Sequence, residues 1–442
     1  HKLVTGEWSG TMNLTEPQAG SDLSTVTTKA EPEGGHFRIK GTKIYITYGD
    51  HDLTENIIHL VLARLPGAPE GTKGISLFAV PKFLVKDDGS IGERNEVHCL
   101  SLEEKLGIHA SPTAVMSYGE DKGAVGYLVG EENRGLMHMF TMMNNARHAV
   151  GREGLAISES AYQLALQYAM ERKQGNVIGT ATQATIVEHS DVKRMLMRMK
   201  ALTEAMRGLT YTCAYAFDVA ERATDEQECS RASRRGDLLT PVVKGWCTDN
   251  AQIVASLGVQ IHGGMGFVEE TGAAQYMRDA RILPIYEGTN GIQALDLMGR
   301  KTLRDGGQAV SELFEDMENT LSRLGQLDLT NIETAFGESL GHLKEVLDWI
   351  KSNAGNNTLC NSAASHYLEL MGITCGGWML AKSAIVAADQ LAQAPTDVKF
   401  YERKMITVDF YAQQVMPETG SLKDKIISGS QLISDMKLEA FA

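Results

Sequence analysis

One carboxylate in this sequence stands in surroundings that suit acid–base chemistry. Glu287 lies in the run 282–291, which otherwise contains apolar, hydroxyl and amide residues and glycines. Apolar neighbours such as Ile285 and Tyr286 exclude water, and desolvation disfavours an ionised carboxylate, so its pKa is expected to rise towards the range useful for proton abstraction. Gly288 lets the backbone approach a ligand closely. The alternative is a turn residue or an acid in the first turn of a helix.

Two further stretches carry groups that could bind a flat polar ring. The segment Thr11–Asp22 has a Pro and Gly turn after a strand end. Its bare N–H groups and the hydroxyls of Thr15 and Ser21 could hydrogen-bond a heterocycle or its phosphates, although a surface loop has the same composition. Tyr45 and Thr47 are two residues apart on a strand and therefore share a face, which suits stacking on a ring and hydrogen bonding to it.

A third motif, Gln260–Gly266, is rich in glycine and could be only the end of a helix. It is not a Rossmann dinucleotide fingerprint, because no strand precedes it and no βαβ unit is available.

The elements before Gly135 have the pattern of strands. Short β-branched runs are bounded by Gly, Pro and Asp, and no crossover helices lie between them, which favours an antiparallel barrel or sandwich. The runs are Phe37–Lys40, Ile44–Thr47 after the break Gly41–Lys43, Ile57–Leu65, Gly74–Val80 and Ala124–Val129.

From Leu136 the apolar residues recur at helical spacing, which predicts a bundle of long helices. The first covers 136–175, the second runs from Asp191 to about Ala223 with Ser190 as N-cap, and the third opens at Thr240 with Pro241 in its first position. The methionines on one stripe are expected to fill the core, and no metal site is predicted.

A polar, Gly-containing stretch at 305–307 precedes further helical segments, which form a second helical unit. These segments are predicted at 309–324, 332–352, 360–394 and 398–415. The predicted fold is therefore α+β and multidomain. It comprises a β domain at 1–134, a four-helix-bundle-like domain at 135–304 and a C-terminal helical extension at 305–442.

Composition restricts the function classes. The 442 residues carry a net charge of −14, which opposes non-specific nucleic-acid binding. The six cysteines form no CxxC pair, so we expect no disulfide framework and a cytoplasmic protein. No run reaches 18 consecutive apolar residues, and no membrane span is expected.

Taken in order, the motifs resemble those of the acyl-CoA dehydrogenase family over about residues 6–304. The extension is similar to that of larger bacterial members such as the 3-methylmercaptopropionyl-CoA dehydrogenases. The family's N-terminal helical domain has no counterpart here, so we expect a fragment or processed form. The motifs are Leu14–Pro17 with Ala19–Asp22, Lys105–Gly107, Glu188–Val192, Gly263–Gly266 and Tyr286–Thr289.

The resemblance implies FAD as the cofactor. The turn and the strand would hold the flavin ring, although Tyr45 stands where many relatives have Trp. Arg172 matches an arginine that reaches the FAD pyrophosphate of a neighbouring subunit; the aromatic residue usual before Gly175 is absent. The residues assigned to FAD are Met12, Leu14, Thr15, Gly20, Ser21, Tyr45, Ile46, Thr47, Arg172, Gln260, Gly264 and Thr289.

The resemblance also implies the reaction. Glu287 would remove a proton from the carbon next to a thioester carbonyl while a hydride passes from the next carbon to the flavin, which gives a trans-2-enoyl-CoA. Donors aimed at the thioester oxygen would stabilise the developing charge. Residues expected at the substrate are Ser21, Arg147, Tyr286 and Gly288. For Arg147, a salt bridge on a helix surface is the alternative.

The implied partners are an acyl-CoA, an electron-transfer flavoprotein and further copies of the chain in a homodimer or homotetramer. Two alternative functions use related chemistry or folds: an acyl-CoA oxidase, in which oxygen reaches the reduced flavin, and a flavoprotein of the alkylation-response type that binds DNA. The sequence leaves the identity of the acyl chain open.

Overall fold

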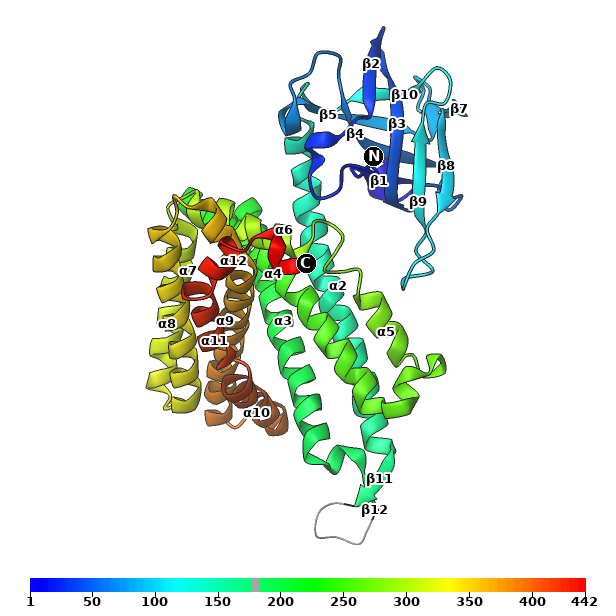
Figure 1. Ribbon diagram of the computed structural model, residues 1–442. Helices are drawn as coiled ribbons and strands as arrows, with labels where there is room; N and C mark the ends of the chain where they lie inside the picture. The colour runs from blue at the N-terminus through cyan, green and yellow to red at the C-terminus, as the bar shows by residue number, and fades with distance from the viewer. Residues whose placement is uncertain (177–182) are drawn as a thin grey trace. The chain divides into compact units, whose positions relative to one another are not determined.

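The computed structural model describes residues 1–176 and 183–442. The chain divides into two compact units, 1–145 and 146–442. The first is built on a β-sheet and the second on helices, so the predicted α+β class is confirmed (Figure 1).

The sheet of the first unit has eight strands, and most neighbours are antiparallel. The prediction of an antiparallel sheet needs a correction, because β4 runs parallel to both β1 and β2. β2 (Lys29–Glu33) pairs with β3 and β4. Along the sheet the other strands follow the order β1 (Trp8–Asn13), β4 (Asn56–Arg64), β5 (Ile75–Pro81), β10 (Ala124–Leu128), β3 (His36–Thr47), β9 (Thr113–Tyr118) and β8 (Val97–Leu102).

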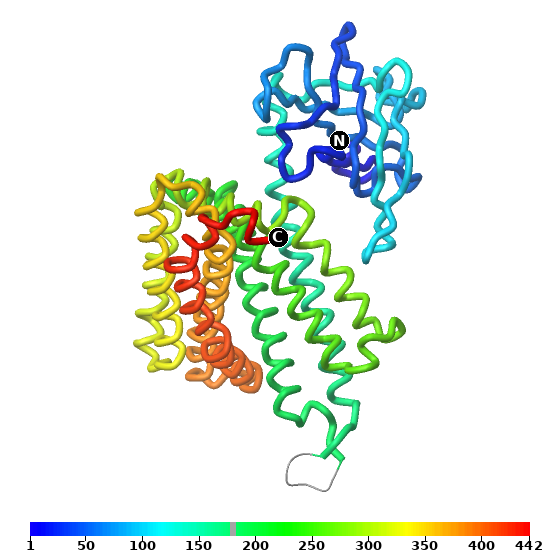
Figure 2. Tube along the Cα trace, viewed as in Figure 1, coloured from blue at the N-terminus to red at the C-terminus, as the bar shows by residue number. Residues whose placement is uncertain are grey.

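Short elements complete this unit, and the chain can be followed through them in Figure 2. β6 and β7 form a separate two-stranded ribbon. The short elements are α1 (Lys2–Thr5), η1 (Leu23–Thr25), η2 (Gly71–Gly74), β6 (Phe83–Val85) and β7 (Ile91–Arg94).

The predicted break at Gly41–Lys43 is wrong, because β3 runs through it as one strand. The strand changes partner there: its first half pairs with β10, and from Gly41 onward it pairs with β9. Glycine is needed at this point, since a Cβ on Gly41 would lie 2.4 Å from the Oγ1 atom of Thr28. The local composition indicated a turn, but it marks a close approach of β2.

A buried ion pair joins β3 to the turn that follows β1. Lys43 Nζ lies 2.8 Å from Glu16 Oε1 and also donates to the carbonyl oxygen of Leu14 at 3.0 Å. Both side chains are almost completely buried. Burial raises the pKa of Glu16, but the charge of Lys43 and hydrogen bonds from Lys43, Thr28 and Thr27 outweigh it and lower the pKa to about 2. The turn is thereby fixed against the strand.

The second unit is a bundle of long helices. Helix α2 (Gly135–Glu171) enters it, and α3, α4, α5 and α6 follow, as Figure 1 shows. Between α2 and α3 the strands β11 and β12 form a two-stranded antiparallel ribbon. The remaining bounds are β11 (Lys173–Asn176), β12 (Gln183–Thr185), η3 (Ile186–Glu188), α3 (Ser190–Arg222), α4 (Glu226–His262), η4 (Gly263–Phe267), η5 (Glu269–Thr271), α5 (Ala273–Ala280), α6 (Asn290–Leu295) and the π-helical η6 (Asp296–Leu303).

Two helix starts differ from the prediction. The N-cap of α3 is His189, and Ser190 is already the first helical residue. Helix α4 begins at Glu226 and contains Pro241 within it. The true N-cap is Asp225, whose Oδ1 accepts hydrogen bonds from the N–H groups of residues 227 and 228 at 2.7 and 3.0 Å. This cap, together with ion pairs from the first turns of α4 to α7, supports the polar segment before the proline.

The C-terminal helices pack on α3 and α4 through one continuous apolar core. Trp246 of α4 fits against two glycines of α9; a Cβ on Gly372 would lie 2.2 Å from its Cγ atom, and one on Gly376 would lie 2.8 Å from its Cη2 atom. These helices are α7 (Gln308–Gln326), α8 (Thr330–Ser352), α9 (Asn357–Ala392), α10 (Val398–Gln414), α11 (Glu418–Ile427), α12 (Ser430–Ser434) and η7 (Leu438–Phe441).

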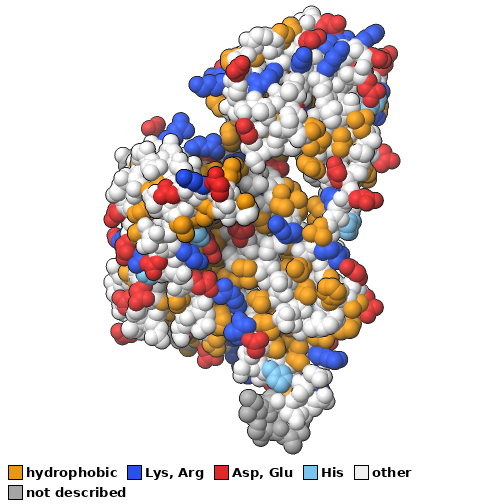
Figure 3. Space-filling model, viewed as in Figure 1, with side chains coloured by type: hydrophobic (Ala, Val, Ile, Leu, Met, Phe, Trp, Pro, Cys, Tyr) orange, Lys and Arg blue, Asp and Glu red, His pale blue; other side chains and the backbone are white. Residues whose placement is uncertain are grey.

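Among the described residues, α9 is the one helix long and apolar enough to cross a membrane, and 78% of its most apolar window is buried inside the unit. Such burial is typical of a core helix. On the face seen in Figure 3, basic and acidic side chains are interspersed.

The buried pair generates a stability prediction. Replacing Lys43 by Met leaves the Glu16 carboxylate buried without its partner, so we expect the free energy of unfolding to fall by about 3–5 kcal/mol. The double variant Glu16→Gln, Lys43→Met, which removes both charges, should lose less. Because the pKa of Glu16 is depressed in the fold, its contribution is present above pH 4.5 and is lost as the pH falls towards 2. Urea unfolding followed by circular dichroism tests this; equal midpoints for wild type and Lys43→Met would contradict it.

Candidate active site

Glu287 lies in the loop between α5 and α6 of the helical unit. Its φ angle is 55° and that of Gly288 is 84°, so two successive residues adopt the left-handed conformation. For a glutamate this conformation costs about 1–2 kcal/mol. At the end of the loop Thr289 caps α6, since its Oγ1 accepts from the N–H of Ile292 at 3.3 Å. A strained residue persists only where its surroundings hold it.

Three side chains from three helices hold the carbonyl oxygens of this loop. Gln293 of α6 donates to the carbonyl oxygens of Glu287 and Gly288 at 3.3 and 3.2 Å. Arg147 of α2 donates from Nε to the Glu287 carbonyl at 3.4 Å, and Lys244 of α4 donates from Nζ to the Gly288 carbonyl at 2.8 Å. A side chain at position 288 would meet Gln293, because a Cβ there would lie 2.9 Å from its Nε2 atom.

Burial raises the pKa of the Glu287 carboxyl. The positive charges of Arg147 and Lys244 oppose this rise, and the negative charge of Glu153 adds to it. The apolar cluster beside the loop includes Leu283, with Tyr286 packed against it. The direction of the shift agrees with the expectation from the apolar run. A carboxylate with a raised pKa binds a proton more strongly than an exposed one, which is what a general base requires.

Arg147 is buried, with 3% of its surface exposed, so the alternative of a pair on a helix surface is wrong. Its Nη1 lies 3.6 Å from Asp296 Oδ2, and Arg300 binds the other oxygen of Asp296. The arginine therefore lies beneath the loop, between Glu287 and the start of η6.

Tyr286 is half-buried and donates its phenolic hydrogen to Glu153 on α2. Burial raises the pKa of Tyr286, and the hydrogen bond to Glu153 adds to the rise. The tyrosine therefore stays neutral and ties the loop to α2 beside Glu287.

The two stretches predicted to hold the flavin ring lie together in the β unit. The N–H of Ile44 donates to the carbonyl oxygen of Thr15 at 3.0 Å, which joins the turn to β3. Tyr45 has a φ angle of 60° and is 61% exposed. Its neighbour Ile46 is buried, and Thr47, like Tyr45, is exposed.

The other cofactor residues of this unit belong to the same turn. Met12 and Leu14 pack partly against the core, whereas Gly20 and Ser21 are exposed. An exposed aromatic ring on strained backbone, next to a turn with the exposed Ser21, fits a planar polar ligand.

Arg172, Gln260 and Gly264 form a second group inside the helical unit. Arg172 follows the last residue of α2, and Gln260 lies near the end of α4; both are exposed. The ring of Tyr168 stacks on His262 with centroids 4.5 Å apart, which brings these two helix ends together. Arg172 lies 25 positions after Arg147, directly beyond the end of α2, which corresponds to about 37 Å along the helix. This group therefore lies far from Glu287 within the unit.

Several residues around Glu287 were not predicted from the sequence: Glu153, Lys244, Gln293 and Asp296. Lys244 had a signal, because it is the single charge in the apolar helical stretch 238–247. Gln293 and Asp296 follow the motif directly, but nothing in their spacing distinguishes them from ordinary helix residues.

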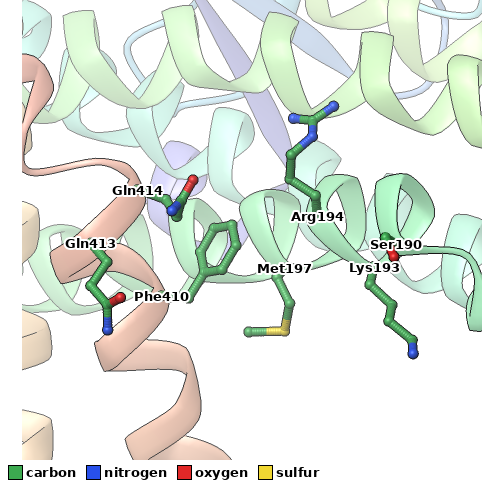
Figure 4. A pocket seen from close by; sticks show the side chains of 7 residues that line it. All are labelled: Ser190, Lys193, Arg194, Met197, Phe410, Gln413 and Gln414. Carbon is green, nitrogen blue, oxygen red and sulfur yellow. The ribbon is translucent and has the colours of Figure 1, made fainter.

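A pocket of about 460 Å³ lies between the first turns of α3 and helix α10, as Figure 4 shows. It contains none of the predicted site residues and is lined by Ser190, Lys193, Arg194, Met197, Phe410, Gln413 and Gln414.

Three family models match the chain in succession. The "Acyl-CoA dehydrogenase, middle domain" matches residues 11–119, and the "Acyl-CoA dehydrogenase, C-terminal domain" matches residues 133–302. "Acetyl-CoA dehydrogenase C-terminal like" matches residues 313–437.

Solved structures share the fold. Caenorhabditis elegans ACDH-11 in complex with C11-CoA superimposes with a TM-score of 0.76 at 23% identity, covering 95% of this chain and 68% of that one. An acyl-CoA dehydrogenase from Bacillus anthracis complexed with FAD gives a TM-score of 0.70 at 19% identity, covering 97% and 70%. At these identities the likeness concerns the fold alone.

Curated relatives are closer in sequence. The 3-methylmercaptopropionyl-CoA dehydrogenase of Ruegeria pomeroyi is 50% identical over 441 residues, which are 98% of this chain and 74% of that protein. A butyryl-CoA dehydrogenase of Syntrophomonas wolfei is 36% identical over 461 residues, covering 100% and 74%. Identity of this extent over three quarters of the relatives, together with the matching family models, shows that the chain belongs to the acyl-CoA dehydrogenase family.

Proposed function

We propose that the chain dehydrogenates an acyl-CoA thioester between its α and β carbons with FAD as cofactor, and that Glu287 is the base. The observation that carries the assignment of the base is the raised pKa of Glu287 on a loop held by Arg147, Lys244 and Gln293. The Glu287 carboxylate takes the α-proton and becomes a carboxylic acid. When bound, FAD takes up the hydride from the β carbon, so the thioester loses one proton and one hydride and gains a double bond.

The cofactor residues keep their predicted roles in this proposal. The turn with Thr15 and the exposed ring of Tyr45 would bind and orient the flavin. Thr289, which would also contact the flavin, is the N-cap of α6, the helix that follows the Glu287 loop. Ser21, Tyr286 and Gly288 are assigned to the substrate, and Arg147 supports the loop from beneath.

The arrangement of α2 supports an oligomer. Arg147 and Arg172 are separated by about 37 Å along the helix, a span longer than an extended dinucleotide. If Arg172 and Glu287 each serve an FAD, they serve two different molecules. Arg172, Gln260 and Gly264 would then contact the FAD of another copy in a homodimer or homotetramer.

The substrate and electron acceptor are proposed from the relatives. Identity of 50% to a 3-methylmercaptopropionyl-CoA dehydrogenase favours that thioester or a short linear acyl-CoA. An electron-transfer flavoprotein is the expected acceptor. The cysteines found in the described part of the chain are all unpaired, which supports the cytoplasm as the compartment.

Replacement of Glu287 by Gln tests the base directly. The variant keeps the size of the side chain but removes the proton acceptor, so we expect flavin reduction by acyl-CoA to slow by about 10²- to 10⁴-fold. Stopped-flow absorbance under anaerobic conditions measures the rate. Glu338→Gln, at an exposed position of α8, is the matched control and should reduce its flavin at the wild-type rate. Unchanged flavin reduction in Glu287→Gln would rule out this base.

The same variant should be more stable at neutral pH. Because the folded-state pKa of Glu287 is raised above 4.5, the folded chain binds more protons than the unfolded chain above that pH. The carboxyl's contribution to stability is therefore lost as the pH rises through the folded pKa. We expect the difference in Tm, Glu287→Gln minus wild type, to be larger at pH 7 than at pH 4.5. A difference that is constant or smaller at pH 7 would contradict the raised pKa.

A titration of the flavin-loaded chain tests substrate class. We expect anaerobic bleaching by 3-methylmercaptopropionyl-CoA and butyryl-CoA, with rates that fall as the linear chain lengthens. Absorbance of the oxidised flavin follows the reaction. Bleaching by long-chain acyl-CoA alone would contradict the proposed substrate class, and no bleaching by any thioester would contradict the proposed activity.

A further inference from the structure

Lys244 is a buried cation that proton abstraction by Glu287 does not use. Its side chain has no exposed surface, although it carries an amine in the middle of α4. Burying an ammonium group is costly unless it is compensated. Burial lowers the pKa of Lys244 to about 7, against the opposing effect of the negative charges of Asp249 and Glu287. A cation retained at such a cost indicates a role for its charge or its hydrogen bonds.

The hydrogen bonds of Lys244 converge on the loop that carries Glu287. Its Nζ atom donates to the Gly288 carbonyl and to Asn290 Oδ1, each at 2.8 Å. The amide of Asn290 in turn donates to Asp249 Oδ1 at 2.7 Å and to Thr248 Oγ1 at 2.9 Å. The lysine thus fixes both the peptide after Glu287 and the first residue of α6. All of these hydrogen bonds tie the loop to α4.

We propose that Lys244 is a positioning residue for Glu287: it holds the left-handed peptide at 287–288 in place through the Gly288 carbonyl and Asn290, and its positive charge favours the ionised form of the Glu287 carboxylate. This inference rests on the proposed function, in which that ionised form accepts the proton. Lys244 donates to the backbone directly after the base, so its loss changes both the geometry and the charge at one place.

Other charged groups face the same region and set the background for this effect. From α2 come Arg147, which also favours the carboxylate, and Glu153, which opposes it. Asp249 of α4 faces Lys244 and lies within the influence of Arg281, and Glu369 of α9 faces Asp249. Asp296 and Arg300 surround Arg147 rather than Lys244.

The first test is the pH dependence of flavin reduction by butyryl-CoA in the FAD-loaded chain. In Lys244→Met, the lost hydrogen bonds should slow reduction by about 10- to 100-fold. The midpoint of the acid limb should also rise by about 0.5 pH unit or more, because Glu287 loses a neighbouring positive charge. Lys244→Arg should restore the wild-type midpoint.

Two variants separate charge from structure. Thr248→Val removes a hydroxyl from the same network without changing charge, so its acid-limb midpoint should equal that of the wild type even if its rate falls. Lys244→Gln keeps a hydrogen-bond donor but removes the charge, so it should shift the midpoint of the acid limb. If Lys244→Met does not fold, Lys244→Gln alone tests the role of the charge. An acid limb in Lys244→Gln that matches the wild type would overturn the proposal.

A second readout needs no flavin. Between pH 7 and 10.5 the unfolded chain binds a proton at Lys244 that the folded chain does not, so wild-type stability should gain on Lys244→Gln as the pH rises across this window. A Tm difference between the two that does not change with pH would contradict the lowered pKa of Lys244 in the fold. If the wild-type chain is not bleached by any acyl-CoA, the proposed function fails; if it is bleached and only the Lys244 variants behave as wild type, this inference alone fails.

Discussion

The left-handed backbone at Glu287 and Gly288 is the constraint on which the candidate site depends. A glutamate adopts this conformation only where other groups hold its peptide, and here donors come from α2, α4 and α6. The long helices α2 and α4 and the short helix α6 therefore do more than bury an apolar core. Each contributes one side chain to the same short loop, and each of these side chains is largely removed from water. In such a buried environment hydrogen bonds are stronger and unpaired polar groups cost more free energy.

The electrostatics of the loop follow from the same arrangement. Burial alone would raise the pKa of Glu287 and leave it protonated over a wider pH range. Arg147 and Lys244 limit that rise, whereas Glu153 adds to it through its place beside Tyr286. A base needs both a high affinity for protons and a substantial ionised fraction at the working pH. The opposed charges around Glu287 supply this balance.

The sequence predicted the elements that local patterns control. The change from strands to helices near residue 135, the bulk of α2, α3, α7, α8, α9 and α10, and the turn beside β3 all followed from periodicity, caps and motifs. Errors arose where tertiary contacts decide the outcome. Gly41 was interpreted as a break because its local composition indicates a turn, but glycine is needed there because Thr28, just before β2, lies too close for a side chain. Pro241 was interpreted as a helix start, although an earlier cap and ion pairs to α7 carry the helix through it.

The candidate site divides in the same way. Glu287 could be found from its apolar run. Lys244 lies 43 residues before Glu287 in the sequence, and Gln293 lies in α6; both donate hydrogen bonds to the loop that carries Glu287. No local sequence pattern predicts such contacts. The roles assigned to the flavin and substrate residues remain predictions, as do the domain limits at 134 and 304.

The central claim is that Glu287 is a partly desolvated base, and infrared difference spectroscopy of wild type minus Glu287→Gln measures it most directly. A protonated carboxyl band that titrates above pH 4.5 is the predicted result; a band that titrates at or below pH 4.5 would contradict it.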